Sequence, residues 1–149
     1  MEKKLTVEDA RQSLTAHAAD KGAQVHEKYG PEIGWKELQL LLEDRTCVRY
    51  PCTIVFDTAC LQAGEMAHPE PLGDNPEDGF KMYVHPVLMT RLKEVPAVVL
   101  YQIVLVNYGE LASPDDGEVF GAHALGISVE EYYNMLCEIA DELEQVAAV

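Results

Sequence analysis

The sequence predicts a helix-rich α+β domain with a small sheet of two or three strands. Two short runs, 51–57 and 79–85, are rich in β-branched and aromatic residues and are bounded by proline, aspartate or glycine, which is typical of strands. Most other segments carry helix start and stop residues and apolar side chains at helical spacing. The 149-residue chain contains no interdomain linker or internal repeat, so we expect residues 1–149 to form a single domain with one core.

The first helix is predicted to run from its N-cap, Thr6, to about Tyr29. Asp9 stands three positions after Thr6, as in a capping box, and Gly30-Pro31 is expected to end the helix. The apolar residues of this segment are mostly alanines, which offer little surface to bury. We therefore expect a peripheral helix with a weak point at Gly22.

A second helix and two strands are predicted in the next part of the chain. Residues 35–43 have the spacing of a short amphipathic helix, and 51–57 and 79–85 are the strands. The segment 61–78 is rich in glycine, proline and acidic residues, so we expect a long irregular connection with a short extended piece near 65–67. The predicted inward and outward positions follow from the two periodicities: Trp35, Leu38, Leu41 and Leu42 on one helix face; Phe80, Met82 and Val84 on one side of the second strand; Lys81, Tyr83 and His85 on the other.

The most apolar run of the chain, 96–106, is expected to be the central helix of the core. Only Gln102 interrupts it, and a helix that is apolar on all sides belongs inside a fold. Its periodicity alone would also fit a buried strand. Its length, Pro96 at a first-turn position and Gly109 at the C′ position favour a helix. A short helix over 87–93 is expected to precede it.

Two further helices are predicted at the C-terminal end. Ser113-Pro114 supplies an N-cap and a proline at the first helical position for a helix that ends near Leu125. Ser128 and Glu131 have the spacing of a capping box for the last helix, 130–146. The residues expected to pack that helix on the core are Tyr133, Leu136, Cys137, Ala140 and Leu143.

The charge of the chain excludes two classes of partner. There are 26 acidic and 11 basic residues, for a net charge of −15. Such a field repels nucleic acids and anionic membrane surfaces. We expect the charge to serve solubility, with docking of a basic protein partner as the alternative. No run is long enough to span a membrane and no secretory signal is visible, so a cytoplasmic location is expected.

Familiar catalytic motifs are missing from the sequence. The ten glycines are scattered and form no phosphate-binding loop, and there is no G-x-S-x-G elbow. The four cysteines include no Cys-x-x-Cys and are expected to be reduced thiols. We therefore expect neither nucleotide binding nor serine hydrolysis, and no cofactor.

A metal- or thiol-dependent function remains as an alternative. Soft ligands are concentrated in and beside the strand–loop–strand region 47–85, where they could gather zinc. No pair of them has the short, fixed spacing of a structural zinc site, so we expect no metal. The alternative depends on convergence in space of these residues: Cys47, Cys52, Cys60, His68 and His85.

The order of elements over about 50–125 resembles the minimal zincin metallopeptidases. There a central helix carries H-E-x-x-H, in which two histidines bind zinc and the glutamate activates the bound water. In this chain the motif would fall on Tyr101, Gln102 and Leu105. Leucine cannot bind zinc, and the neutral glutamine cannot accept the proton of the bound water. Glu118 is at most a loose match for a downstream glutamate ligand. A catalytic zinc needs three protein ligands. The resemblance therefore implies a zincin-like scaffold without zinc and without peptidase activity.

The same resemblance implies a residual binding groove. In zincins the strand before the active-site helix can pair with an extended peptide, and here that strand would be 80–85. We expect a non-catalytic protein that binds a peptide or a protein, with its oligomeric state left open. Gln102 distinguishes two possibilities. If its amide faces a cleft, a binding site is retained at the motif position; if the amide is hydrogen-bonded inside the core, the residue has only a structural role. The expected groove residues are Tyr83, His85, Tyr101, Gln102, Leu105 and Glu118.

Overall fold

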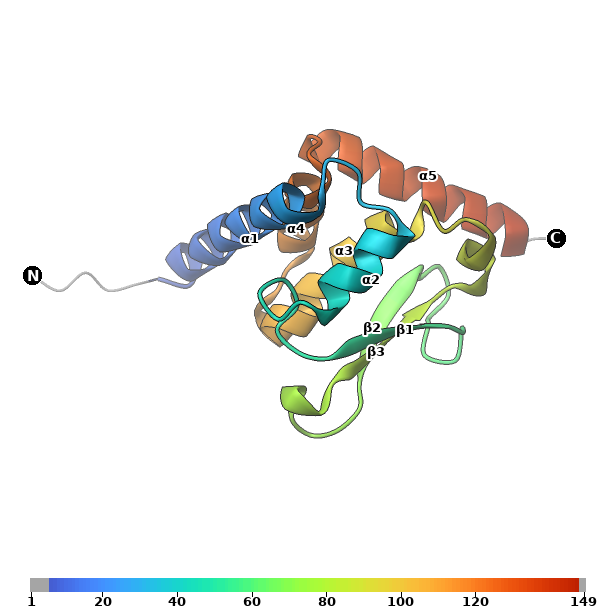
Figure 1. The fold of residues 1–149 in the computed structure, drawn as a ribbon, viewed down its shortest axis with the longest axis horizontal. Coiled ribbons are helices and arrows are strands. Elements are labelled where there is room, and N and C mark those ends of the chain that lie inside the picture. The colour runs from blue at the N-terminus through green and yellow to red at the C-terminus, as the bar shows by residue number, and fades with distance from the viewer. Residues whose placement is uncertain (1–5, 148–149) are drawn as a thin grey trace, which may run out of the picture.

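The computed structural model describes residues 6–147 as five α-helices, three short 3-10 helices and a three-stranded sheet (Figure 1). The predicted α+β class is confirmed. The elements follow in this order: α1 (Val7–Tyr29), α2 (Trp35–Glu43), β1 (Cys52–Phe56), β2 (Ala67–Pro71), η1 (Pro76–Asp78), β3 (Phe80–Val84), η2 (Pro86–Thr90), α3 (Val95–Tyr108), η3 (Gly109–Leu111), α4 (Pro114–Leu125) and α5 (Val129–Ala147).

The predicted helix ends are present in the structure. The side chains of Thr6, Ser113 and Ser128 accept hydrogen bonds from the backbone N–H three residues later, at 3.1, 3.4 and 3.0 Å. These caps satisfy N–H groups that have no partner within the helix. Gly109 and Gly126 end α3 and α4 with φ of +59° and +72°, a region that favours glycine. Local sequence therefore sets where these helices begin and end.

The sheet contains one strand more than the two clear strand signals. Its order is β1-β3-β2, with β1 parallel and β2 antiparallel to the central β3. β2 lies in the segment expected to be irregular, because Pro69 and Pro71 weaken its strand signal. His85 N–H donates to Met66 O and Leu72 N–H donates to Gly79 O, both at 2.9 Å. Together with the register, these bonds show which β2 residues direct their N–H and C=O groups toward β3 and which direct them away. Pro69 and Pro71 are at positions whose nitrogens point away from β3, to the free edge of the sheet. Their missing N–H groups therefore cost no hydrogen bond between the strands.

The buried helix α3 forms the centre of the core. It contacts α2, α4, α5 and the strands β2 and β3, and in Figure 1 it lies between α5 and the sheet. Ten of its 14 residues are buried, which confirms the predicted central helix. The inward positions of β3, Met82 and Val84, are fully buried against it. Within residues 6–147, no helix is both long and apolar enough to cross a membrane.

Helix α1 packs against α4 through its small residues. A Cβ at Gly22 would lie 2.5 Å from the Phe120 carbonyl oxygen, so the glycine permits a close approach and is not a weak point. Thr15 Oγ1 donates a 2.6 Å hydrogen bond to the buried Asp116 near the start of α4. The N-terminal half of α1 is exposed and extends past the body of the molecule, as expected for a peripheral helix (Figure 1).

Helix α5 packs on the core through a stripe that differs from the prediction. Tyr132, rather than Tyr133, is fully buried, and Tyr133 is 53% exposed. Cys137 and Ala140 are only partly buried. The apolar side of α5 is wider than the core surface that it covers. Tyr133, Cys137 and Ala140, along one edge of that side, therefore stay accessible. The buried stripe consists of Tyr132, Leu136, Ile139 and Leu143.

Candidate binding groove

Three adjoining hollows form a groove between the loop before β2 and helices α3, α4 and α5. We name them the His85 end, the centre and the His68 end, with volumes of about 290, 260 and 310 Å³. The His85 end and the centre share Gly64, Glu65 and Ala140. The centre and the His68 end share Glu65, Tyr101 and Gln102, so Glu65 borders all three hollows.

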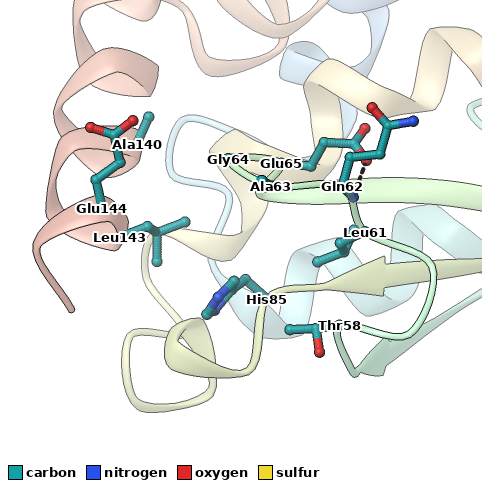
Figure 2. A pocket seen from close by; sticks show the side chains of 10 residues that line it. All are labelled: Thr58, Leu61, Gln62, Ala63, Gly64, Glu65, His85, Ala140, Leu143 and Glu144. Atoms are coloured by element: carbon teal, nitrogen blue, oxygen red, sulfur yellow. Dashed lines mark hydrogen bonds between the residues drawn. The ribbon is translucent and has the colours of Figure 1, made fainter. Parts of the chain in front are cut away.

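The His85 end lies between α5 and the loop 58–65. Figure 2 shows Leu143 and Glu144 of α5 on one side and His85 with the loop on the other. The loop is held in a turn by Glu65, whose Oε1 accepts a 2.7 Å hydrogen bond from the Gln62 backbone N–H. His85 Nδ1 accepts a 3.2 Å bond from the backbone N–H two residues later, so the neutral ring carries its proton on Nε2. This end of the groove is therefore ordered by local hydrogen bonds.

The centre places Gln102 in an open cleft. Gln102 lies on α3 beside Tyr101, and both line the centre and the His68 end. Within residues 6–147 the Gln102 amide forms no hydrogen bond, and the only buried side-chain polar atom without a partner is Glu94 Oε2. The Gln102 amide is therefore accessible from the groove. Gln102 therefore faces a cleft, and its amide is not hydrogen-bonded inside the core.

Two glycines of α4 bring the groove walls into position. A Cβ at Gly117 would lie 2.8 Å from the Tyr101 carbonyl oxygen and 3.1 Å from its ring. A Cβ at Gly121 would lie 2.2 Å from the ring of Tyr132, whose hydroxyl donates a 2.5 Å hydrogen bond to the Ala97 carbonyl. Since Tyr132 points into the core, its neighbour Tyr133 is turned about 100° around the helix and lines the groove.

The groove carries negative charge. Glu65, Glu118 and Glu144 line it, and among residues 6–147 no Lys or Arg lines any of the three hollows. Burial raises the pKa of Glu118, and the nearby Asp115 carboxylate raises it further. The pKa of the Tyr101 phenol is raised first by burial and then by these two carboxylates. A cation in the centre would relieve this repulsion.

Five of the six expected groove residues line the hollows. Glu118 borders the centre, His85 the end named after it, and Leu105 the His68 end, while Tyr101 and Gln102 border two hollows. Tyr83 lines none of them. It alternates with the buried Met82 and Val84, so it points to the opposite side of the sheet.

The expectation that residues 80–85 pair with an extended peptide is wrong. β3 is the middle strand and is bonded to β1 on one side and to β2 on the other, so it has no free edge. The edge that borders the groove belongs to β2. Of its three outward positions, Pro69 and Pro71 have no N–H, and only Ala67 can donate a hydrogen bond.

The alternative set of cysteines and histidines does not converge. Among residues 6–147, no three His, Cys, Asp or Glu side chains are grouped so that they could hold a metal ion. Burial raises the pKa of Cys52 to about 11 and also raises that of Cys47, so both remain protonated thiols at neutral pH. His68 lies instead beside two glutamates, at 3.7 Å from Glu65 and 3.8 Å from Glu70.

Tyr133, Glu65 and Ala140 are groove residues that sequence reasoning did not assign to the site. Tyr133 and Ala140 were placed in the core-facing stripe of the last helix, and the width of that stripe was the only signal for a second role. Glu65 lies in a loop without periodicity and gives no signal. Comparison of the chain with protein-family models, with curated proteins and with solved structures found no match.

Proposed function

We propose that the protein binds a basic, partly apolar segment of another protein in the groove, on a zincin-like scaffold that catalyses no reaction. The observation that carries this proposal is the accessible Gln102 amide on an otherwise apolar, buried helix. Because the amide opens to the groove, water can satisfy it in the free protein. A bound segment can replace that water with its own polar groups.

The residues at the zincin motif position support binding without chemistry. Leu105 has no ligand atom for zinc, and the neutral amide of Gln102 cannot accept a proton from water. Tyr101 lies where the first histidine would be, with its pKa raised by burial, so its phenol stays protonated at neutral pH. A catalytic zinc site requires three protein ligands, which these positions do not supply.

The division of the groove into three adjoining hollows supports a peptide segment. The hollows have volumes of about 290, 260 and 310 Å³ and share lining residues. A segment that places successive side chains into the three hollows uses the whole groove. Because the outward edge of β2 offers only one donor, the Ala67 N–H, beside its carbonyl acceptors, strand addition there would leave most of the ladder unmade. The segment is therefore held by its side chains.

Charge supports a basic occupant. The groove is acidic, and the chain as a whole has a net charge of −15. Complementary charge speeds association and suppresses acidic competitors. The apolar wall formed by Tyr133, Leu136 and Ala140 of α5 requires that the segment also carry apolar side chains.

A peptide library tests the proposal. Random 12-residue peptides displayed on phage would be selected on the full-length protein, and the selected peptides synthesised and titrated by fluorescence anisotropy. Ala140→Phe fills the wall shared by two hollows, and Asn134→Phe makes a similar addition at an exposed site of α5 outside the groove. We expect the Ala140→Phe variant to bind selected peptides at least about tenfold more weakly, and the Asn134→Phe variant to bind like the wild type.

Two results would overturn this proposal. One is that selected peptides bind both variants equally and lose affinity only with added salt, which assigns binding to the acidic surface in general. The other is stoichiometric zinc in elemental analysis together with a hydrolytic activity that is lost on chelation.

A further inference from the structure

Two tyrosine rings from different helices line the centre of the groove. Tyr101 projects from α3 and Tyr133 from α5, and both border the hollow of about 260 Å³. Within residues 6–147, the cations that lie over aromatic rings are Lys28 over Tyr29 and Arg49 over Tyr50. In the described part of the chain, no cation therefore covers Tyr101 or Tyr133.

The carboxylate beside these rings also has no basic partner among the described residues. Glu118 of α4 lines the same hollow and forms no ion pair within residues 6–147. It borders this hollow together with Tyr101 and Tyr133. The centre is thus lined by two aromatic rings, from α3 and α5, and by two carboxylates, Glu118 of α4 and Glu65 of the loop before β2.

Apolar side chains of α3 and α5 complete the lining of the centre. Val98, Leu136 and Ala140 line the centre together with the rings. Lysine and arginine bury their methylene stems against such surfaces while their charged ends reach a polar partner. Aromatic faces attract these cations, more strongly where water is excluded. The combination fits an alkyl chain that ends in a positive charge.

We infer that the centre of the groove is a receptor for one lysine or arginine side chain of the bound segment, with Tyr101 and Tyr133 against the cation and Glu118 as its counter-ion. This inference rests on the proposed function and specifies the residue that anchors the segment. Gln102, at the rim of the same hollow, offers its amide to the backbone of the segment beside the anchor.

Two small probes isolate the anchor from the rest of the segment. n-Butylammonium has the end of a lysine side chain, and 1-butanol has a similar size without charge. Each would be titrated at constant ionic strength into full-length protein with ¹³C-labelled tyrosine and followed by NMR. We expect n-butylammonium to shift the ring signals of Tyr101 and Tyr133 in a saturable manner and 1-butanol to bind at least about threefold more weakly.

Matched variants assign the effect to residues. Glu118→Gln should weaken n-butylammonium binding by roughly fivefold, whereas Glu77→Gln, at an exposed position outside the groove, should not change it. Tyr133→Leu removes an exposed ring and should weaken binding by roughly threefold, while Tyr133→Phe keeps the ring and should bind like the wild type.

The outcomes separate this inference from the proposed function. Equal binding of the two probes, or no effect of Glu118→Gln, overturns the cation receptor. If library peptides then still bind in a manner sensitive to Ala140→Phe, the groove retains its proposed function with a different anchor. Selected peptides that share one Lys or Arg, and lose at least about fivefold affinity on its replacement by norleucine, support the receptor.

Discussion

Gly117 of α4 faces Tyr101 of α3 so closely that a Cβ at position 117 would lie 2.8 Å from the Tyr101 carbonyl oxygen. The contact joins the backbones of two helices, and a Cβ there would also meet the Tyr101 ring at 3.1 Å. The ring that borders two hollows is thus positioned by a rigid helix pair and not by a flexible loop. Its position should depend on the absence of a side chain at residue 117.

Gly117→Ala is expected to destabilise the protein and to weaken peptide binding. The added methyl group must push α4 away from α3, which costs about 1–3 kcal/mol of unfolding free energy in a packed interior. Urea denaturation followed by circular dichroism measures this loss. Gly34→Ala is the control, because its Cβ would meet only the Glu37 carboxylate at 3.4 Å. Equal stability of the two variants would contradict the close contact between α3 and α4.

Gln102→Leu is expected to leave stability within about 0.5 kcal/mol of the wild type while peptide affinity falls. The amide has no partner within residues 6–147, so its removal breaks no bond of the folded chain. Thermal unfolding and peptide titration would be measured on the same sample. A loss of about 1–3 kcal/mol would mean that the amide is hydrogen-bonded in the core, as in the architectural alternative.

Asn107→Leu is the matching change on the same helix and is expected to be destabilising. Asn107 is 6% exposed; its side-chain nitrogen donates to the Cys47 carbonyl at 3.0 Å, and its oxygen accepts from the Arg49 N–H at 2.8 Å. Leucine leaves both loop groups without partners, at a cost of about 1–3 kcal/mol. Urea denaturation should show this loss for Asn107→Leu and not for Gln102→Leu.

Asp44 should make stability depend on pH in the acid range. Hydrogen bonds from Lys28, Thr46 and Tyr29 hold the pKa of the Asp44 carboxyl well below its usual range. A carboxyl whose pKa is lower in the folded state contributes stability above its unfolded pKa of about 3.9, and that contribution is lost as the pH falls through the folded value. Asp44→Asn should therefore cost about 1–3 kcal/mol at pH 7.

The difference between wild type and Asp44→Asn should shrink progressively below about pH 4. Urea midpoints measured between pH 7 and pH 2 test this dependence. Asp20→Asn, which removes an exposed carboxylate from α1, should show no comparable difference at any pH. A penalty for Asp44→Asn that is the same at pH 2 and pH 7 would contradict the ionic role of Asp44.

The parts of the fold that were predicted depend on neighbouring residues. The N-caps at Thr6, Ser113 and Ser128 and the helix ends at Gly109 and Gly126 are decided within four or five positions. The segment that forms β2 was expected to be irregular, since it becomes a strand only by pairing with β3. Its prolines are tolerated only because β3 pairs with the other side of the strand, which no local pattern reveals.

The candidate site divides in the same way. Gln102 is visible in the sequence as the one polar residue of an apolar run, and its neighbour Tyr101 was assigned to the groove with it. The predicted role of Tyr133 in the core was wrong, because Tyr132 takes that place against Gly121. Periodicity identifies the apolar side of a helix. Which apolar residues on that side are buried, and which stay accessible, depends on the elements that pack against it.

By itself, the sequence determined the helices, their caps, the central apolar helix and the strongly acidic charge. Each follows from short-range spacing or from composition. Only the tertiary structure decided that β3 is the middle strand, that Pro69 and Pro71 occupy a free edge, and that Gln102 opens into a groove. These features depend on contacts between segments far apart in the chain, such as Gly117 against Tyr101, whose geometry no local pattern specifies.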